Sequence, residues 1–218
     1  MHILILGPTG RTGRLLVQEA LNRGHRVNVL VGHKSSLLVN PDLVTVFEGT
    51  ALNKFTLAEA MQGCDAVLST LNISRVSDFP WAKLRTSIDF LSLSMKNIIE
   101  AATAQHVNRI IVTTAWGVAE TKKDIPFWFR FLVDHSNIRY PYLDHERVEK
   151  MLEKSDLNFT AVRPAGLTDS EKMKEIKVTL NNIPKPSLYI SRLNVALFML
   201  DVLENDLYNR QCPVISEK

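Results

Sequence analysis

The chain has 218 residues, 45% of them apolar and 22% charged, a composition typical of one ordinary globular domain. Its formal net charge is only +3, and the basic residues are scattered, which argues against a nucleic-acid partner. No apolar run approaches the roughly 18 residues of a membrane span, and the N-terminus lacks a signal-peptide layout. Cys64 and Cys212, the only cysteines, form neither a disulfide framework nor a metal motif. We therefore expect a cytoplasmic monomer or homodimer with no nucleic-acid, membrane or metal partner.

The first predicted strand, residues 3–6, runs directly into a glycine turn. Glycines follow at Gly7, Gly10 and Gly13, and residues 14–21 then show helical spacing of apolar side chains. A strand, a glycine turn and a helix N-terminus together direct backbone N–H groups and the positive end of the helix dipole to one point. Glycines let a pyrophosphate approach the backbone, and let the helix approach the sheet. The turn therefore predicts a dinucleotide-phosphate site, with a purely structural tight turn as the alternative.

Strand-like and helical segments alternate along almost the whole chain, which predicts a parallel sheet with helices on both faces. We expect one Rossmann-like, doubly wound α/β domain over residues 1–218, with substrate-side elaborations around 116–142 and 164–190. The less regular stretch 116–139 is rich in aromatic residues. The predicted strands are 3–6, 26–31, 43–48, 66–71, 109–113, 159–162 and a short one at 213–215. The predicted helices are 14–21, 56–61, about 85–105, 144–155 and 192–204.

The end of the second strand decides which dinucleotide is preferred. A carboxylate there would accept hydrogen bonds from the adenosine ribose and favour NAD. The chain instead reads Gly32, His33 and Lys34, so a 2′-phosphate can meet Lys34 and His33, with Arg11 adding a charge-assisted bond. This pattern favours NADP(H) over NAD(H). The alternative is that Lys34 and Arg11 are solvated surface charges and that the site takes either cofactor.

The ends of the later strands supply the remaining candidates. Thr50 and Ala51 follow the third strand, where the adenine is expected. Asn72 follows the fourth and can bond the ribose or phosphates, or it can merely cap a turn. Thr113 and Thr114 end the fifth strand beside the expected nicotinamide, where one hydroxyl can orient a substrate carbonyl or the carboxamide. Alternatively, each threonine packs its methyl group and bonds the local backbone.

Four ordered motifs carry a family resemblance: the GxxGxxG turn, the block 63–67, the block 152–164 that ends in Arg163-Pro164, and the block 190–200. Together they resemble the atypical, NmrA-like short-chain dehydrogenase/reductases, of the biliverdin reductase B or NADPH-flavin reductase type. The resemblance implies NADP(H) bound across the carboxyl edge of the sheet. It also implies hydride transfer to a flat acceptor, such as a flavin or a linear tetrapyrrole. The residues that it assigns to the pyrophosphate are Gly7, Thr9, Gly10, Arg11, Thr12 and Gly13, and those around the nicotinamide are Leu71, Asn72, Thr113, Thr114 and Pro164.

The chain departs from the superfamily at the catalytic pair Tyr-x-x-x-Lys. Tyr140 is followed four residues later by Asp144, and Tyr142 by Glu146. The place of the lysine falls on His145, which is a candidate proton relay or else a packing residue. Thr114 precedes Ala115, which stands where flavin-reductase relatives carry a serine. Carbonyl reduction of the Tyr-Lys type is therefore disfavoured, and Thr114 and His145 are the candidate catalytic residues.

Two functions remain open at this point. One is an NAD(P)H-dependent reductase of a flat conjugated acceptor such as a flavin, since hydride transfer to a flavin needs little more than stacking and a solvent proton. The other is a non-catalytic NAD(P)-binding redox sensor or regulator. The aromatic segments 79–81 and 116–131 favour the first if they form a stacking lid over the acceptor. They are uninformative if they are packed core or a dimer patch.

Overall fold

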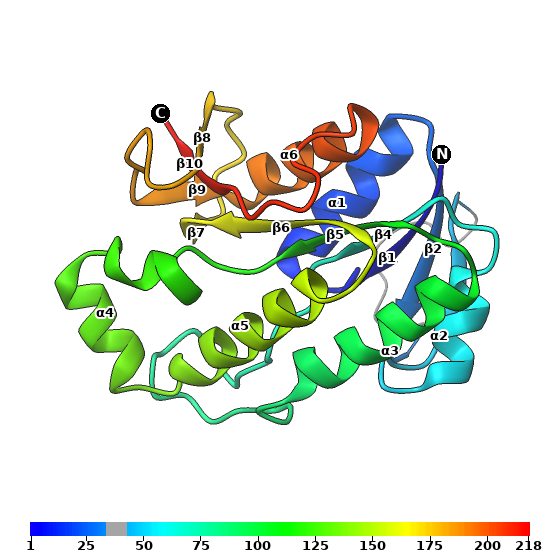
Figure 1. Ribbon diagram of the computed structural model, residues 1–218, viewed down its shortest axis with the longest axis horizontal. Coiled ribbons are helices and arrows are strands. Elements are labelled where there is room, and N and C mark those ends of the chain that lie inside the picture. The colour runs from blue at the N-terminus through cyan, green and yellow to red at the C-terminus, as the bar shows by residue number, and fades with distance from the viewer. Residues whose placement is uncertain (34–42) are drawn as a thin grey trace.

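The centre of the protein is an eight-stranded sheet with the strand order β3-β2-β1-β4-β5-β6-β10-β8 (Figure 1). Neighbouring strands are parallel except for the last, β8, which runs antiparallel to β10. The computed structural model describes residues 1–33 and 43–218. The strands of this sheet are β1 (His2–Leu6), β2 (Arg26–Val31), β3 (Thr45–Glu48), β4 (Ala66–Ser69), β5 (Arg109–Thr113), β6 (Asn158–Pro164), β8 (Ile176–Thr179) and β10 (Val214–Glu217).

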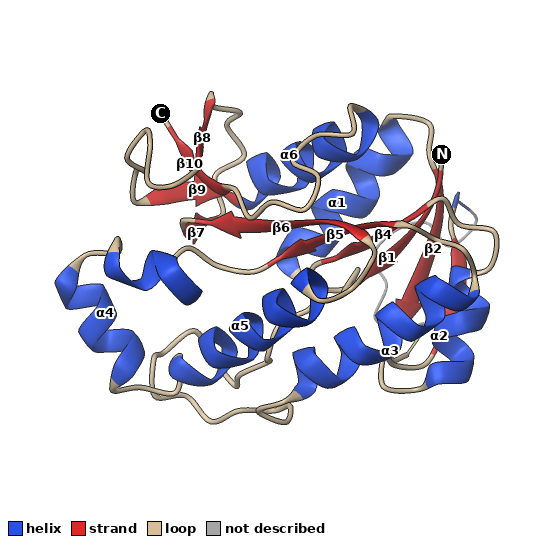
Figure 2. Cartoon of the chain, in the orientation of Figure 1, coloured by secondary structure: helices blue, strands red, loops and turns tan. Residues whose placement is uncertain are grey.

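Helices cover both faces of the sheet, which confirms the predicted doubly wound α/β fold (Figure 2). Helices α1 and α6 pack together on one face, and α2, α3 and α5 lie on the other. The helices are α1 (Arg11–Asn22), α2 (Lys54–Met61), α3 (Phe90–Ala104), α4 (Phe127–Asp134), α5 (Arg139–Glu153) and α6 (Arg192–Glu204).

Strand β1 shows why the two faces are both apolar. Ile3 and Ile5 pack with α1 and α6, whereas Leu4 and Leu6 point to the core under α2 and α3. Each of these four side chains is at most 1% exposed. Alternate residues of a strand point to opposite faces, so a strand that is buried on both faces has an uninterrupted apolar sequence.

The strand order reverses at β1, which lies between β2 and β4. The chain leaves β1 through α1 toward β2, and later crosses over in the other direction to β4. In sheets of this kind, ligands bind beyond the carboxyl ends of the strands at such a switch point. The glycine turn and the segment after β4 lie at this place.

The structure differs from the predicted elements at one strand of the main sheet and at several segments outside it. Strand β8 was not predicted, and it makes one edge of the sheet antiparallel. Helix α3 begins at Phe90 rather than near residue 85, because residues 72–89 form a loop joined by an isolated bridge between Arg75 and Leu84. Helix α5 begins at Arg139 rather than at 144, and Pro141 is tolerated because its position in the first turn requires no backbone donor. The stretch 116–139 contains α4 and a short 3-10 helix, Ala119–Lys123. A separate two-stranded sheet pairs β7 (Gly166–Thr168) with β9 (Tyr189–Ser191), within the 164–190 elaboration and just beyond it.

Within residues 1–33 and 43–218, no helix is both long enough and apolar enough to cross a membrane. The same residues contain no cluster of histidine, cysteine and carboxylate side chains suited to a metal ion.

Candidate functional site

The glycine turn is packed too closely for side chains. Gly7 has φ +80°, and a Cβ atom on it would lie 3.0 Å from the carbonyl carbon of Thr70. A Cβ atom on Gly13 would lie only 2.0 Å from the carbonyl oxygen of Gly7, so the first turn of α1 rests directly against the end of β1. The Thr70 hydroxyl donates toward the carbonyl oxygens of Leu6 and Gly7, at 3.2 Å each. The glycines are therefore required by the close approach of helix, turn and β4.

The N-terminus of α1 is open to an anion. Its N-cap residue is Gly10, which offers no side-chain acceptor, and no acidic residue lies in the first turn. The first backbone N–H groups of a helix have no partner within the helix. In α1 the first i to i−4 backbone hydrogen bond is donated by Arg14 N to Gly10 O, at 3.0 Å. The N–H groups of Arg11, Thr12 and Gly13 thus fit a pyrophosphate at the positive end of the helix dipole. Thr9, on the exposed side of the turn, is placed to join them.

The Arg11 side chain points away from the end of β2, toward Asp78 and Asp169. Its guanidinium donates two hydrogen bonds to Asp78, at 2.8 and 3.0 Å, and Nη1 lies 3.7 Å from Asp169. This Arg11 holds the pKa of Asp78 below its usual value. Asp78 lies after β4 and Asp169 after β7, whereas the predicted 2′-phosphate contacts follow β2. The observed Arg11 conformation therefore fits a role at the pyrophosphate or beyond it better than the predicted bond to a 2′-phosphate.

The ends of β2 and β3 form the side of the site expected for adenosine. His33 is exposed, with Nδ1 3.4 Å from Glu48 Oε1, and Lys34 lies outside the described residues. The Thr50 hydroxyl accepts a hydrogen bond from Leu52 N at 3.2 Å. The Ala51 carbonyl accepts one from the Asn97 side chain of α3 at 3.0 Å. The loop after β3 is thus held in place by α3.

The segment after β4 reaches the middle of the site. Leu71 N lies 3.5 Å from the Ser69 hydroxyl, and the Asn72 side-chain oxygen accepts from Ile73 N at 2.8 Å. Asn72 therefore makes the turn contact that its residue type favours, while its side-chain amide is left for another acceptor. The Thr113 hydroxyl donates to the Ser69 carbonyl at 3.4 Å.

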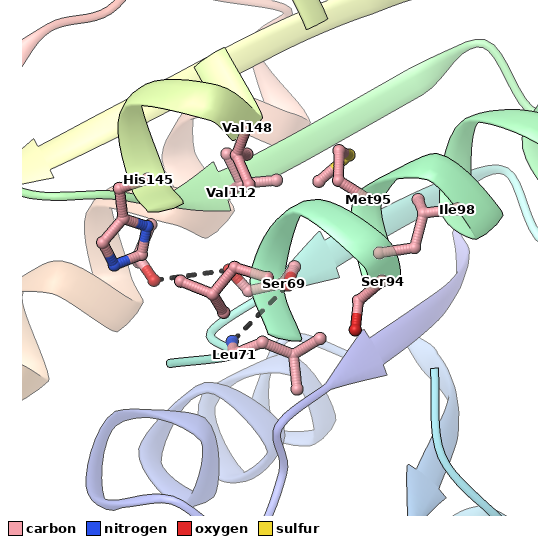
Figure 3. Close-up of a pocket in the computed structure, with 10 residues that line it drawn as sticks. Ser69, Leu71, Ser94, Met95, Ile98, Val112, His145 and Val148 are labelled. Carbon is pink, nitrogen blue, oxygen red and sulfur yellow. Dashed lines mark hydrogen bonds between the residues drawn. The ribbon is translucent and has the colours of Figure 1, made fainter. Parts of the chain in front are cut away.

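A small cavity of about 20 Å³ lies behind these strand ends, large enough for about one water molecule. Figure 3 shows His145 of α5 on one side of it, with Ser94 of α3 and Ser69 and Leu71 on the others. Burial lowers the pKa of His145 from 6.5 to about 4, against a small opposing effect of Asp144. His145 is therefore neutral at physiological pH, and in the described parts of the chain its ring nitrogens have no hydrogen-bond partner.

Thr114 belongs to a buried ionic network rather than to an open surface. Its hydroxyl donates to Glu149 Oε1 at 2.7 Å, and Glu149 also accepts from Arg163 Nε at 2.9 Å and Nη2 at 2.7 Å. Arg163 bonds Glu120 as well, and the side chains of Arg163 and Glu149 are only 3% and 2% exposed. Burial alone would lower the pKa of Arg163, but the two carboxylates raise it well above its usual value. Because Thr114 already donates its proton to Glu149, this geometry suits it to hold the end of β5 rather than to protonate a substrate.

Pro164 closes this end of the sheet. It is the last residue of β6, it is buried, and its carbonyl accepts a hydrogen bond from Trp116 N at 3.0 Å. The bond ties the segment after β5 to the end of β6, beside the predicted nicotinamide position.

No tyrosine of the chain is followed four residues later by lysine. Tyr142 donates its hydroxyl to the Trp116 carbonyl at 3.3 Å, and burial raises its pKa above the usual value. A catalytic tyrosine needs the opposite shift, because it must release a proton near neutral pH. Tyr142 is therefore unsuited to acid catalysis.

Exposed aromatic side chains gather on the loop after β4 and on α4. The Trp81 indole donates to the His135 carbonyl at 3.0 Å, which joins that loop to the end of α4. Phe79 and Trp81 have ring centroids 5.4 Å apart and are 62% and 52% exposed. Phe127 and Trp128 of α4 are 73% and 61% exposed. Within the predicted aromatic segments, these four side chains are therefore surface, whereas Trp116 is core, at 5% exposure.

The comparisons with known proteins agree with this geometry. A family model described as NAD(P)H-binding matches residues 7–206. The chain belongs to this family, which confirms the resemblance to the NmrA-like, atypical short-chain dehydrogenase/reductases. NAD(P)H is therefore the class of cofactor that this family binds.

Individual relatives are distant. An oxidoreductase of Pestalotiopsis microspora is 25% identical over 92% of this chain and 79% of its own length. Among solved structures, ChuY, an anaerobilin reductase of Escherichia coli O157:H7, aligns with a TM-score of 0.81 and 18% identity over 100% of this chain and 97% of its own. A short-chain dehydrogenase/reductase of Veillonella parvula, solved with NADP, aligns with a TM-score of 0.79 and 18% identity. The alignment covers 99% of this chain and 94% of that one. At such identities the structures show the shared fold alone. This chain spans between 46% and 63% of the length of three further curated relatives.

The sequence reasoning missed several residues that the structure brings to the site. Asp78 and Asp169 lie in irregular segments, and no motif marks them as partners of Arg11. Glu149 and Arg163 face each other from α5 and β6. The sequence analysis assigned Arg163 only to a family motif and gave Glu149 no role, because the pairing of these two residues depends on the packing of α5 against β6.

Proposed function

We propose that the protein is an NAD(P)H-dependent reductase that transfers hydride to a flat, conjugated small molecule such as a flavin. The observation that carries this proposal is the open N-terminus of α1 behind a glycine turn, beside the ends of β4, β5 and β6. The bound nicotinamide supplies the hydride, and the protein supplies binding and orientation. The family match and the likeness to reductases support the proposal.

The acceptor class follows from three candidate proton donors among residues 1–33 and 43–218, none of which is suited to protonate a substrate. Tyr142 has a raised pKa, His145 is neutral and buried, and Thr114 donates to Glu149. Reduction of an ordinary carbonyl requires a positioned proton donor, whereas reduction of a flavin can take its proton from solvent. The exposed rings of Phe79 and Trp81 offer a surface on which a conjugated acceptor can stack.

The residues that follow β2 favour NADP(H) over NAD(H). The end of β2 carries no carboxylate that would repel a 2′-phosphate, and Lys34 follows His33 in the sequence. The structural relative solved with NADP supports this choice. We expect Lys34→Ala to weaken NADPH binding about tenfold and to leave NADH binding unchanged. Lys154→Ala, at the opposite edge of the sheet, is the control. An unchanged NADPH preference in Lys34→Ala contradicts the proposed 2′-phosphate site.

The reductase is tested by following NADPH oxidation with FMN, riboflavin and a quinone as acceptors. We expect turnover with at least one flavin above the rate without protein. Tight NADPH binding with no turnover of any of these acceptors would contradict the proposal.

A second candidate is a non-catalytic NAD(P)-binding sensor or regulator. The specific observation in its favour is that two buried groups around the site, Thr114 and Arg163, both donate to the Glu149 carboxylate. Such a network keeps the site rigid but contributes no reactive group. The result that contradicts the reductase, binding without turnover, is the result that this candidate predicts.

A further inference from the structure

A second concave site lies beside the glycine turn, between the first turns of α1 and α6 and the segment after β7. Its cavity volume is about 320 Å³. Arg11 and Arg14 of α1 and Arg192 of α6 line it, together with Asp169 and Glu171. No contact that we have assigned to the dinucleotide uses Arg14 or Arg192.

The charges of this cavity favour an anion. Arg192 is nine-tenths buried, and its Nη1 lies 2.6 Å from Asp169 Oδ1. Burial, and then the nearby Arg11, lower the pKa of Arg192. The side chain of Arg14, unlike its backbone N–H, makes no hydrogen bond or ion pair with any residue in the described ranges. Three arginines and two carboxylates line the cavity, while a third carboxylate, Asp78, lies outside the lining and pairs with Arg11. The helices α1 and α6 both begin here, so their dipoles add positive potential.

The cavity shares residues with segments that lead toward the place expected for the acceptor. Arg11 belongs to both the glycine turn and the cavity. At the other end, Asp169 directly follows β7, which begins two residues after Pro164 at the end of β6. A three-residue strand spans about 10 Å, which is within reach of a flexible polar side chain of a bound acceptor. Leu167 of β7 and Tyr189 of β9 are 42% and 57% exposed along this path.

We propose that this cavity binds the terminal anionic group, a phosphate or a carboxylate, on a side chain of the conjugated acceptor. The inference rests on the proposed reductase function and narrows its substrate class to anionic acceptors. Guanidinium groups suit both anions, because their planar donors form paired, charge-assisted hydrogen bonds.

Asp169 has a distinct part in this site. It already neutralises Arg192 and approaches Arg11, so an incoming anion competes with it for the same donors. Asp169→Asn should therefore strengthen binding of an anionic acceptor, whereas Arg14→Gln should weaken it. Because the two substitutions are expected to change the affinity for an anionic acceptor in opposite directions, they separate a charge effect from general damage to the fold.

The test compares FMN with riboflavin, which share the ring system and differ in the terminal phosphate. Binding is measured by quenching of flavin fluorescence on the NADPH-free and the NADP-loaded protein, without turnover. We expect FMN to bind at least tenfold more tightly than riboflavin. We also expect Arg14→Gln to lower this ratio severalfold and Asp169→Asn to raise it. Arg26→Gln, an exposed residue at the opposite edge of the sheet, should leave the ratio unchanged.

Equal affinity for FMN and riboflavin, or a ratio that does not respond to Arg14→Gln, would overturn the inference. Inorganic phosphate is titrated separately. If phosphate binds and the two flavins still bind equally, the cavity takes a free anion, and the proposal is likewise overturned. A phosphate-dependent difference in binding without any turnover supports the cavity and contradicts the reductase, so the two failures are distinguishable.

Discussion

Buried His145 should make the stability of the protein depend on pH. Its pKa is about 4 in the folded protein, against an ordinary value of 6.5, because burial disfavours the charged imidazole. The unfolded chain therefore binds a proton below pH 6.5 that the folded protein accepts only near pH 4. The resulting stability is fully present above pH 6.5 and is lost as the pH falls toward 4. Each pH unit in this window removes about 1.4 kcal/mol, so the loss between pH 6.5 and 5 is about 2 kcal/mol.

The assay is urea unfolding followed by tryptophan fluorescence at pH 7 and pH 5, with wild type and His145→Asn. The free energy of unfolding of wild type should fall by about 2 kcal/mol more than that of His145→Asn, because all other titrating groups are common to both. His106→Asn is the control: His106 is exposed and has φ +56°, a conformation that asparagine tolerates. Equal losses in wild type and His145→Asn would refute a neutral, buried His145.

Four further substitutions, two of them combined in one double variant, test the packing that surrounds the site. Gly13→Ala should abolish NADPH binding and lower the melting temperature, since the new Cβ would lie 2.0 Å from the Gly7 carbonyl oxygen; normal binding would contradict the close packing. Arg163→Met leaves the Glu149 carboxylate buried without its partner and should cost about 3–5 kcal/mol in urea unfolding. The double variant Arg163→Met with Glu149→Gln should recover part of that loss, because it no longer buries an unpaired charge. If the effects of the two substitutions on the free energy of unfolding simply add, the two residues are not coupled. Asp144→Ala should cost about 1–2 kcal/mol, because this carboxylate accepts two backbone N–H bonds at the start of α3.

The sequence predicted most strands of the sheet and the close packing of the glycine turn because both depend on local patterns. Apolar runs such as 3–6 identify buried strands, and the spacing of Gly7, Gly10 and Gly13 reports how closely α1 approaches β1. The helices on both faces of the sheet were also predicted, because strand-like and helical segments alternate along the chain.

The parts that the sequence missed depend on contacts between distant segments. Helix α4 has only eight residues, six of them apolar, and periodicity alone does not assign so short an apolar run to a helix. Strands β7 and β9 are three residues long, and only their pairing with each other defines them. The side of the site to which Arg11 turns is set by Asp78 and Asp169, which are 67 and 158 residues away in the chain. Local spacing carries no information about such partners.

The ionic groups of the site divide into two sets that differ in burial, and this difference bears on how the site works. Glu149 and Arg163 are both almost fully buried, so a change in their pairing would leave a charge without water or partner. They are therefore suited to hold the ends of β5 and β6 in one arrangement. Arg11 and Asp78 are 46% and 75% exposed, and a pair of this kind contributes little to stability and exchanges partners easily. A pyrophosphate or an acceptor anion can thus recruit Arg11 from Asp78 at small cost, while the buried network keeps the strand ends in place. The buried Glu149–Arg163 pair and the exposed, exchangeable Arg11 are therefore better suited to the proposed binding of an anionic, conjugated acceptor than to acid catalysis by protein side chains.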